Sequence, residues 1–278
     1  MQQRTEPALT ALDPGPDLGP RGPRPATYAI AVACAIAMIV LGAWLKGTPR
    51  DVQLIEWANG MSQGAAPLWS MITVGGLGLS VFIVFTALAH GRGSRACYGL
   101  ASLLWCFPLG GAVSQGLKKL FDVARPAAVL APDQLQVIGE RLTHGSMPSG
   151  HSITAGASLA VALVCWRLHP VTRLGLILLA ALIGLSRNAV AAHWPSDVAA
   201  GLGVGVLVAM LSLKLATRPA LRHWLAGTTA QRLLGLGQVA AGVSMLFVQT
   251  GYPLALPLQW TLAAVGVGSG LWRLAATR

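Results

Sequence analysis

The chain has 278 residues, of which 54% are hydrophobic and only 10% are charged. A soluble globular protein carries about a quarter charged residues, so this composition indicates a protein of the lipid bilayer, where helices satisfy the backbone hydrogen bonds. The formal net charge of +11 would suit nucleic acid, but nucleic-acid-binding proteins carry their basic residues on a polar domain, and the sequence contains none. We therefore expect an all-α, polytopic transmembrane helix bundle with the lipid bilayer, and no nucleic acid, as its partner.

The chain divides into a polar tail and a long apolar part. Residues 1–26 are rich in proline and glycine, and they cannot bury enough apolar surface to fold alone, so we expect a disordered cytoplasmic tail. We expect a six-helix membrane core over residues 27–216 and two additional transmembrane helices over 217–278. Most apolar runs approach the ~20 residues that a helix needs to cross a bilayer; they cover residues 28–45, 66–89, 97–117, 151–167, 172–189, 198–216, 233–249 and 255–272.

The placement of lysine and arginine predicts the orientation of these helices. Cytoplasmic segments of membrane proteins carry an excess of these residues. With eight crossings and the N-terminus inside, 13 of the 20 lie in inside segments and 7 in outside segments, which predicts that both termini are cytoplasmic. The outside seven are Lys46, Arg50, Lys118, Lys119, Arg125, Arg141 and Arg187, and tryptophans expected to anchor the span ends at the interface are Trp44, Trp166, Trp260 and Trp272.

Three clusters of polar residues interrupt the apolar pattern, and the predicted orientation puts all three on the outer face. Lys118–Pro126 ends the third run, Pro148–His151 opens the fourth, and Ser186–Asp197 links the fifth run to the sixth. A helix bundle can bring the three clusters together at the membrane surface. We therefore treat them as one candidate site.

The cations and the second cluster together describe a phosphate-binding site. Lys118, Arg125 and Arg187 would be costly near a bilayer unless an anion pairs with them, and arginine forks and a lysine charge suit phosphate oxygens. Ser149 and Gly150 precede a predicted helix, whose free N–H groups and positive dipole end favour an anion. Glycine also lets the backbone approach a ligand closely.

Two histidines and one carboxylate supply the reactivity. His193 can act as a nucleophile if a carboxylate holds its far ring nitrogen, and Asp197 lies four residues further on. His151 would then protonate the leaving alkoxide as the general acid. The sequence shows no dense carboxylate cluster for magnesium or calcium, so we expect no metal and no cofactor.

Other polar residues have less distinct roles. His144 lies on the predicted outer loop and could touch the substrate, whereas Asp122 could pair with a cation of the site or face water. The remaining histidines are expected to lie at cytoplasmic ends without a catalytic role, and the cysteines are expected to be small buried residues; these are His90, His169, His223, Cys34, Cys97, Cys106 and Cys165.

At these three clusters the sequence resembles the type 2 phosphatidic acid phosphatase superfamily of membrane lipid phosphatases. That family's pattern is Lys-x6-Arg-Pro, Pro-Ser-Gly-His and Ser-Arg-x5-His-x3-Asp, and the chain matches it in full over about residues 66–216. The resemblance implies a six-helix phosphatase core, a phosphohistidine at His193, Asp197 as its partner and His151 as the acid. The phosphoryl-binding residues that it implies are Lys118, Arg125, Ser149, Gly150, His151 and Arg187.

The last part of the chain departs from the simplest plan of this family. We interpret residues 217–278 as two extra helices in which Gly266, Gly268 and Gly270 permit close packing. These helices could mediate homo-oligomerisation or shape the entrance for the lipid, and the sequence does not decide between the two.

The expected protein is a multi-pass phosphatase of the plasma (inner) membrane, with its active site on the periplasmic or extracytoplasmic face. The candidate substrates are undecaprenyl diphosphate, phosphatidic acid, phosphatidylglycerol phosphate and a lipid A phosphate. A lipid phosphotransferase and a non-catalytic transporter of lipid phosphates are the alternatives. Transport needs cations but not a nucleophile, so the two histidines and the aspartate favour catalysis.

Overall fold

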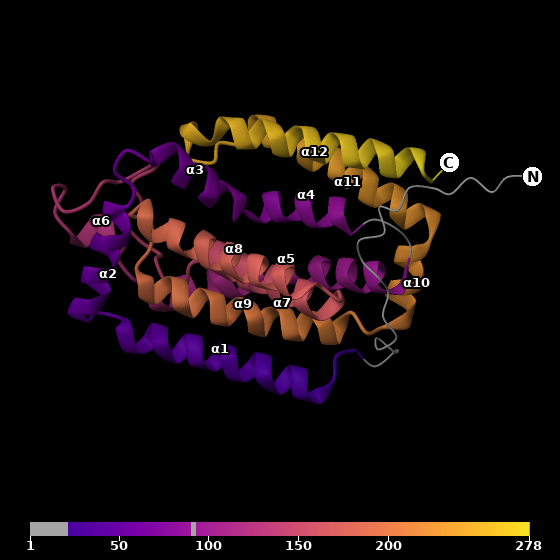
Figure 1. Cartoon of the computed structure of the whole chain (residues 1–278), viewed down its shortest axis with the longest axis horizontal. Helices are drawn as coiled ribbons and strands as arrows, with labels where there is room; N and C mark the ends of the chain where they lie inside the picture. Colours follow the sequence, from indigo (N-terminus) through magenta and orange to yellow (C-terminus); the bar gives the residue numbers. More distant parts are fainter. Residues whose placement is uncertain (1–21, 90–92, 278) are drawn as a thin grey trace, which may run out of the picture.

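The computed structural model describes residues 22–89 and 93–277, and within these ranges every regular element is a helix (Figure 1). Most of the predicted tail, and His90, lie outside the described residues. The elements are α1 (Pro25–Leu45), α2 (Pro49–Gly60), α3 (Ala66–Gly75), α4 (Gly78–Leu88), α5 (Ser94–Phe121), α6 (Pro126–Val129), α7 (Gly150–Cys165), α8 (Pro170–Ala189), α9 (Pro195–Leu215), α10 (Pro219–Ala226), α11 (Thr228–Phe247), the 3-10 turn η1 (Pro253–Ala255) and α12 (Leu256–Ala275).

The long helices lie roughly parallel to the long axis of the molecule (Figure 1). The short helices α2 and α6 lie at one end, whereas α10, the start of α1 and the end of α12 lie at the other. Proline stands in the first turn of α1, α2, α8, α9 and α10, where its fixed φ suits a helix and its missing N–H is not needed. The all-α fold class predicted from composition is confirmed.

Each of the eight apolar runs forms helix, but they differ in how well they suit a bilayer. Five helices are long and apolar enough to cross: α1, α5 extended through α6, α8, α9 and η1 with α12. The run at 66–89 forms two helices, α3 and α4, bent by 65°, and counts as a sixth span if the bent pair is taken together. Helix α7 has only 16 residues, and α11 is not among the helices that meet these criteria.

Helix α9 is the central helix among those formed by residues 25–215, and it packs against α1, α5 and α7. Two of its glycines make this close packing possible. A Cβ on Gly203 would lie 2.5 Å from the carbonyl oxygen of Ala35 in α1, and one on Gly205 would lie 2.2 Å from that of Ile153 in α7. Small residues let helix backbones approach in a membrane, where burial of apolar surface does not drive association.

Helices α11 and α12 pack along each other, and both contact α4. A Cβ on Gly266 would lie 2.8 Å from Gly242 Cα, and one on Gly270 would lie 2.7 Å from the carbonyl oxygen of Gly235. A Cβ on Gly268 would meet no atom within 4 Å. Two of the three predicted packing glycines thus face α11 within the chain, and the third faces away.

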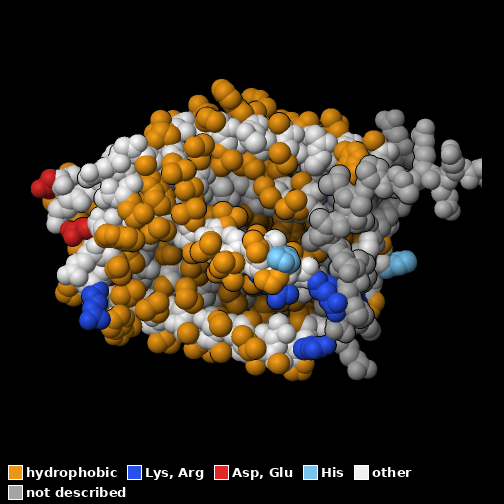
Figure 2. Space-filling view, viewed as in Figure 1, with side chains coloured by type: hydrophobic (Ala, Val, Ile, Leu, Met, Phe, Trp, Pro, Cys, Tyr) orange, Lys and Arg blue, Asp and Glu red, His pale blue; other side chains and the backbone are white. Residues whose placement is uncertain are grey.

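Hydrophobic side chains cover the middle of the surface in Figure 2, and most of the visible charged side chains lie toward its two ends. Helix α8 contributes an exposed apolar face that includes Leu174, Leu178 and Leu179. Three of the four predicted interfacial tryptophans are largely exposed, whereas the fourth, Trp166, packs edge-on against Phe85. A surface of this kind suits lipid contact, in keeping with a multi-pass membrane protein.

Candidate active site

The structure brings the three polar clusters together at the end of the molecule that carries α2 and α6. Lys118 lies in the last turn of α5, and Arg125 directly precedes α6. The Pro148–His151 segment leads into α7, and Ser186–Asp197 connects α8 to α9. The backbone N–H of Ser149 donates to the carbonyl of Asp197 at 3.1 Å, which joins the second cluster to the third.

A tight turn after α8 places His193 above Arg187. The carbonyl of Arg187 accepts hydrogen bonds from the N–H groups of Ala192 and His193, at 2.9 and 3.2 Å. Asn188 Nδ2 donates to the His193 carbonyl at 2.8 Å. Within this turn Ala191 adopts a left-handed conformation with φ 59°, which is uncommon for a residue other than glycine and is held by the surrounding structure.

Asp197 is fixed at the start of α9 with one oxygen toward His193. Its Oδ2 accepts hydrogen bonds from the Trp194 N–H at 2.9 Å and from the hydroxyl of Ser146. The same oxygen lies 3.5 Å from Nδ1 of His193, and both side chains are buried. That separation exceeds an ordinary hydrogen bond, so the contact between the two side chains is electrostatic.

The other ring nitrogen of His193 faces a cation. Nη1 of Arg125 lies 3.4 Å from His193 Nε2 and also donates to the Ala192 carbonyl at 2.8 Å. Arg125 Nε and Nη2 donate to the carbonyls of His144 and Gly145, at 2.9 and 3.3 Å. A guanidinium can donate only to an unprotonated nitrogen, so these contacts favour the tautomer with the proton on Nδ1, toward Asp197.

Arg187 is held by two hydroxyl groups. Its Nη1 donates to Thr73 Oγ1 and, at 2.9 Å, to Tyr252 Oη. Its Cζ also lies 5.6 Å from the centre of the Tyr252 ring, within the range of a cation–π contact. These two residues come from α3 and from the loop between α11 and η1.

Among the residues that the structure describes, several buried side-chain polar atoms have no hydrogen-bond partner. Four of them lie on site residues: His151 Nε2, Arg187 Nε, His193 Nδ1 and Asp197 Oδ1. Buried polar groups are almost always paired, so a group of unpaired atoms needs an explanation. Donors from a histidine and an arginine, next to Lys118 and Arg125, suit an oxyanion such as a phosphoryl group.

The sequence of this region also matches a known family. Residues 99–219 match the pattern of the PAP2 superfamily, and they include every residue of the three clusters. Residues 99–219 form a PAP2 superfamily domain. The family resemblance predicted from the three motifs is thereby confirmed.

Curated relatives and one solved structure are similar to parts of this chain. A lipid A 1-phosphatase of Rhizobium johnstonii is 29% identical over 190 residues, covering 60% of this chain and 76% of that protein. One of Rhizobium etli is 43% identical over 67 residues, which cover 24% of this chain and 28% of that protein. The crystal structure of Aquifex aeolicus LpxE matches with a TM-score of 0.53 and 23% identity, covering 61% of this chain and 98% of that chain, and shows the shared fold.

His193 of the PAP2 domain lies outside the spanning helices, in the turn between α8 and α9. Burial lowers its pKa well below the ordinary value, and the positive charges of Arg187, Arg125 and Lys118 lower it further. Both effects disfavour the imidazolium. The ring is therefore neutral at pH 7 and carries the lone pair that a nucleophile needs.

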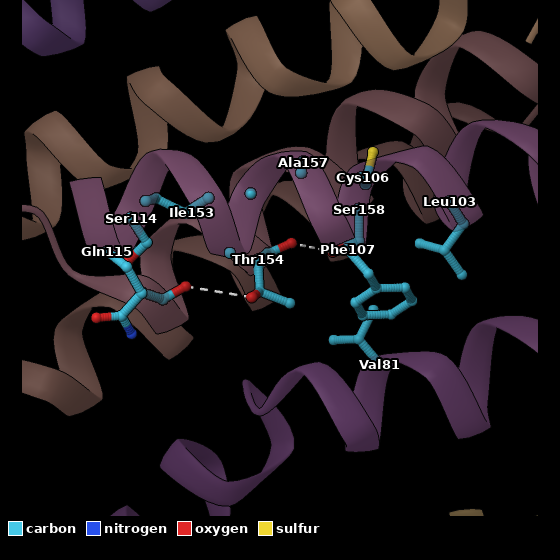
Figure 3. A pocket seen from close by; sticks show the side chains of 13 residues that line it. Val81, Leu103, Cys106, Phe107, Ser114, Gln115, Ile153, Thr154, Ala157 and Ser158 are labelled. Carbon is cyan, nitrogen blue, oxygen red and sulfur yellow. Dashed lines mark hydrogen bonds between the residues drawn. The ribbon is translucent and has the colours of Figure 1, made fainter. Parts of the chain in front are cut away.

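A cavity of about 230 Å³, partly open to the surface, lies beside the PAP2 site between α4, α5 and α7. Figure 3 shows Ser114 and Gln115 toward one end of this cavity, Thr154 near its middle, and Phe107, Val81 and Leu103 toward the other end. Gly150 also lines it, next to Ser149 and His151. The cavity thus leads from the polar site to a largely apolar wall.

The two residues with open assignments pair with each other. His144 Nδ1 lies 3.9 Å from Asp122 Oδ1, and both side chains are 72% exposed. Within residues 22–89 and 93–277, no ion pair joins Asp122 to a cation of the PAP2 site. The carbonyl oxygen of His144 accepts a hydrogen bond from Arg125. Among the described residues, no group of three or more His, Cys, Asp or Glu side chains is arranged to hold a metal ion.

Four residues that contact the site carried no assignment from sequence. Ser146 lies two positions before the second motif, and Asn188 lies at a variable position within the third. Their polar side chains are the only signal that could have suggested a role. Thr73 and Tyr252 lie outside the PAP2 domain and 114 and 65 positions from Arg187. Local patterns of sequence carry no information about contacts over such separations.

Proposed function

We propose that this protein is a membrane lipid phosphatase that hydrolyses a phosphate monoester or diphosphate of a lipid through a phosphohistidine. The observation that carries the proposal is the environment of His193. Its Nδ1 faces Asp197, its Nε2 faces Arg125, and unpaired buried donors lie nearby. The PAP2 domain and the apolar helices support the assignment as a membrane lipid phosphatase.

When the substrate binds, Arg125 Nη1 exchanges its contact with His193 Nε2 for a phosphoryl oxygen. In the first step, the freed lone pair of His193 Nε2 attacks the phosphorus in line with the leaving oxygen. A P–N bond forms as the P–O bond to the lipid breaks. His151 enters this step as the imidazolium, which the negative charge of the bound phosphate favours, and it becomes a neutral imidazole when its Nε2 proton passes to the leaving oxygen. Asp197 stabilises the imidazolium character that develops on His193. Charge on the phosphoryl oxygens is stabilised by Lys118, Arg125 and Arg187.

In the second step, water attacks the phosphohistidine. His151, now unprotonated, takes a proton from the water, the P–N bond breaks, and inorganic phosphate leaves with His193 neutral again. The start of α7 contributes here, because Ser149 and Gly150 open a helix whose free N–H groups favour an anion. Neither step requires a metal ion.

The cavity beside the site supports a lipid as the substrate. It extends from Gly150 to apolar side chains within the helix bundle, a shape that suits a phosphate head group at one end and part of an acyl or prenyl chain at the other. The relatives named as lipid A 1-phosphatases favour a lipid A phosphate among the candidates. Undecaprenyl diphosphate, phosphatidic acid and phosphatidylglycerol phosphate remain the comparison substrates.

We further propose that the site faces the periplasm or extracytoplasmic side of the plasma (inner) membrane. The start of α1 and the end of α12 lie at the opposite end of the molecule from the site (Figure 1). The excess of lysine and arginine predicted for the segments at that end favours a cytoplasmic location for both termini. The lipid head group would then be hydrolysed at the outer leaflet.

The test is phosphate release in detergent with EDTA from a panel of the four lipid phosphates. We expect release by the wild type and loss of at least about 10³-fold in His193→Ala, because the nucleophile is removed. His223→Ala, an exposed histidine on α10, is the matched control and should keep full activity. Equal turnover in His193→Ala would overturn the mechanism.

The same purified protein separates the two alternatives when it is assayed with an added acceptor lipid and, after reconstitution, in liposomes. If phosphate appears only on a second lipid and never free in solution, the protein is a phosphotransferase. If no lipid is hydrolysed but lipid phosphates still cross liposome membranes with His193→Ala, the protein is a transporter. Either result would contradict the hydrolase.

A pair of glycine variants tests the role of the cavity. Gly111 lines it, and a Cβ there meets no atom within 4 Å, so Gly111→Leu adds bulk to the cavity without an internal clash. We expect a raised KM for long-chain lipid phosphates and little change for a short-chain analogue. Gly268→Leu, at a helical glycine with equally open space, is the control, and an equal effect of both variants would contradict chain binding in the cavity.

A further inference from the structure

The C-terminal helices lie beyond the PAP2 domain, yet the loop between them reaches its phosphate site. The domain ends at residue 219, and Tyr252 follows α11. Its hydroxyl oxygen accepts from Arg187 Nη1 at 2.9 Å, and its ring lies 5.6 Å from the guanidinium carbon. We call residues 220–278 the C-terminal extension. One of its side chains, that of Tyr252, therefore contacts Arg187, a residue predicted to bind phosphate, through both its hydroxyl and its ring.

The surroundings of Tyr252 show that this contact is built into the packing. Tyr252 is 8% exposed and belongs to an apolar cluster. The cluster includes Trp69 of α3, Ile138 of the loop between α6 and α7, and Val190 and Ala192 of the turn that carries His193. Such a cluster joins the extension directly to the turn that carries the proposed nucleophile.

A glycine in the loop between α6 and α7 allows the Tyr252 ring to pack closely against that loop. Gly139 has φ +87°, and a Cβ there would lie 2.7 Å from Tyr252 Cε1 and 2.5 Å from the carbonyl oxygen of Gly251. No other residue type combines this backbone conformation with so close an approach. The loop between α6 and α7 and the loop between α11 and η1 therefore pack in direct contact.

The chemistry of the acceptors explains why a tyrosine suits this position. Among the described residues, the side-chain acceptors of Arg187 are the hydroxyl groups of Thr73 and Tyr252, which are neutral. A carboxylate would hold the guanidinium equally well, but it would neutralise the charge and repel a phosphate. Two neutral acceptors fix Nη1, keep the positive charge and leave the buried Nε unpaired.

We propose that Tyr252 is a positioning residue for Arg187 and that the C-terminal helix pair completes the phosphate site. The inference rests on the proposed function in one respect, namely that Arg187 binds the phosphoryl group. Tyr252 acts through Arg187: its hydroxyl and ring hold the guanidinium in the geometry that an oxyanion requires. The extension is thus part of the active site, whatever further role it has in assembly.

The test compares two conservative variants of buried tyrosines. Tyr252→Phe keeps the ring and removes only the hydroxyl. Tyr98→Phe is the matched control, because Tyr98 is also buried, its hydroxyl also makes one hydrogen bond, to the Leu213 carbonyl at 2.9 Å, and a guanidinium lies 5.8 Å from its ring. Its partner Leu213 lies at the end of α9 away from the site, so a general loss of stability affects both variants alike.

The first readout is binding of orthovanadate, measured as the shift of the apparent unfolding temperature with vanadate concentration. We expect about fivefold to tenfold weaker affinity in Tyr252→Phe. This is less than the full effect of one hydrogen bond to a charged group, because Thr73 still holds Arg187 Nη1 and Tyr252 acts only through the position of Arg187. Tyr98→Phe should bind vanadate as the wild type does. Equal affinity in wild type and Tyr252→Phe would overturn the proposal.

The second readout is turnover of the best lipid phosphate. We expect the specificity constant to fall in Tyr252→Phe and not in Tyr98→Phe. If the wild type binds vanadate but releases no phosphate, the proposed function fails, while weaker vanadate binding by Tyr252→Phe still supports the positioning role. If the wild type does not bind vanadate at all, Arg187 is not an oxyanion ligand and both proposals fail.

Discussion

The two ring nitrogens of His193 face groups of opposite charge, and this asymmetry makes the ring suitable as a nucleophile. Asp197 lies on the Nδ1 side and Arg125 on the Nε2 side. The carboxylate favours a proton on Nδ1, and the guanidinium favours a lone pair on Nε2. Three hydrogen-bonding groups fix this geometry from outside the ring: the Ser146 hydroxyl, the Trp194 N–H and the Asn188 amide.

The lowered pKa of His193 makes the stability of the protein dependent on pH. In the folded state the ring stays neutral below its ordinary pKa, about 6.5, whereas in the unfolded chain it binds a proton there. Its contribution to stability is therefore present above about pH 6.5 and is lost as the pH falls toward the folded pKa. We expect the apparent unfolding temperature, measured without oxyanion, to fall more steeply from pH 7 to pH 5 in the wild type than in His193→Gln. Parallel curves would contradict a neutral buried His193.

Helix α2, which the apolar pattern did not predict, supports the start of α9. Asp51 in its first turn is 3% exposed and accepts from the N–H and the hydroxyl of Ser196, at 2.9 and 2.6 Å. Ser196 precedes Asp197, so α2 holds the segment that presents the carboxylate to which we assign a catalytic role. The hydrogen bonds from Ser196 lower the pKa of Asp51, but burial raises it more strongly, so the net shift is upward.

Removal of this contact should reduce both stability and activity. In Asp51→Ala the Ser196 N–H and hydroxyl lose a buried partner, which costs about 1–3 kcal/mol for each unsatisfied group. We expect a lower unfolding temperature and a lower kcat with little change in KM, because Asp197 moves while the cations stay. Glu56→Ala on the same helix is the control, since the contact of Glu56 with Gln134, at 3.5 Å, is exposed. An Asp51→Ala protein as stable and active as this control would count against the support role.

At the scale of the whole molecule, the C-terminal pair is fastened at both ends. Tyr252 holds it at the site, and Arg273 holds it at the opposite end. Arg273 is 1% exposed and donates to the side-chain oxygens of Gln231 and Gln238 in α11 and to the carbonyl of Thr86 in α4, the last at 2.6 Å. A residue predicted to be a cytoplasmic charge is thus a buried link between α12, α11 and the end of α4.

Arg273→Met should destabilise this assembly. Two buried glutamine side chains and a terminal carbonyl of α4 lose their donor, which predicts a loss of at least about 2 kcal/mol. Arg273→Lys should recover part of that loss, and Arg173→Met, at an exposed position on α8, should be neutral. Thermal unfolding in detergent measures all three, and an unchanged midpoint in Arg273→Met would show that the link carries no stability.

The sequence by itself determined the features that depend on short stretches of chain. Composition and the length of the apolar runs predicted the helical fold, because a bilayer imposes both. The spacing of Lys118, Arg125, His151, His193 and Asp197 indicated the family, because these residues lie within three short motifs.

The tertiary structure alone decided how those residues are held. Local periodicity cannot show that Thr73 and Tyr252 share the guanidinium of Arg187, that Asp51 reaches Ser196, or that Asp122 pairs with His144 instead of a cation. Most of these contacts join positions far apart in the chain, and they form only when helices with small residues at their interfaces pack at fixed angles. The residue types of the site are therefore written in the motifs, and its geometry is a property of the packed bundle.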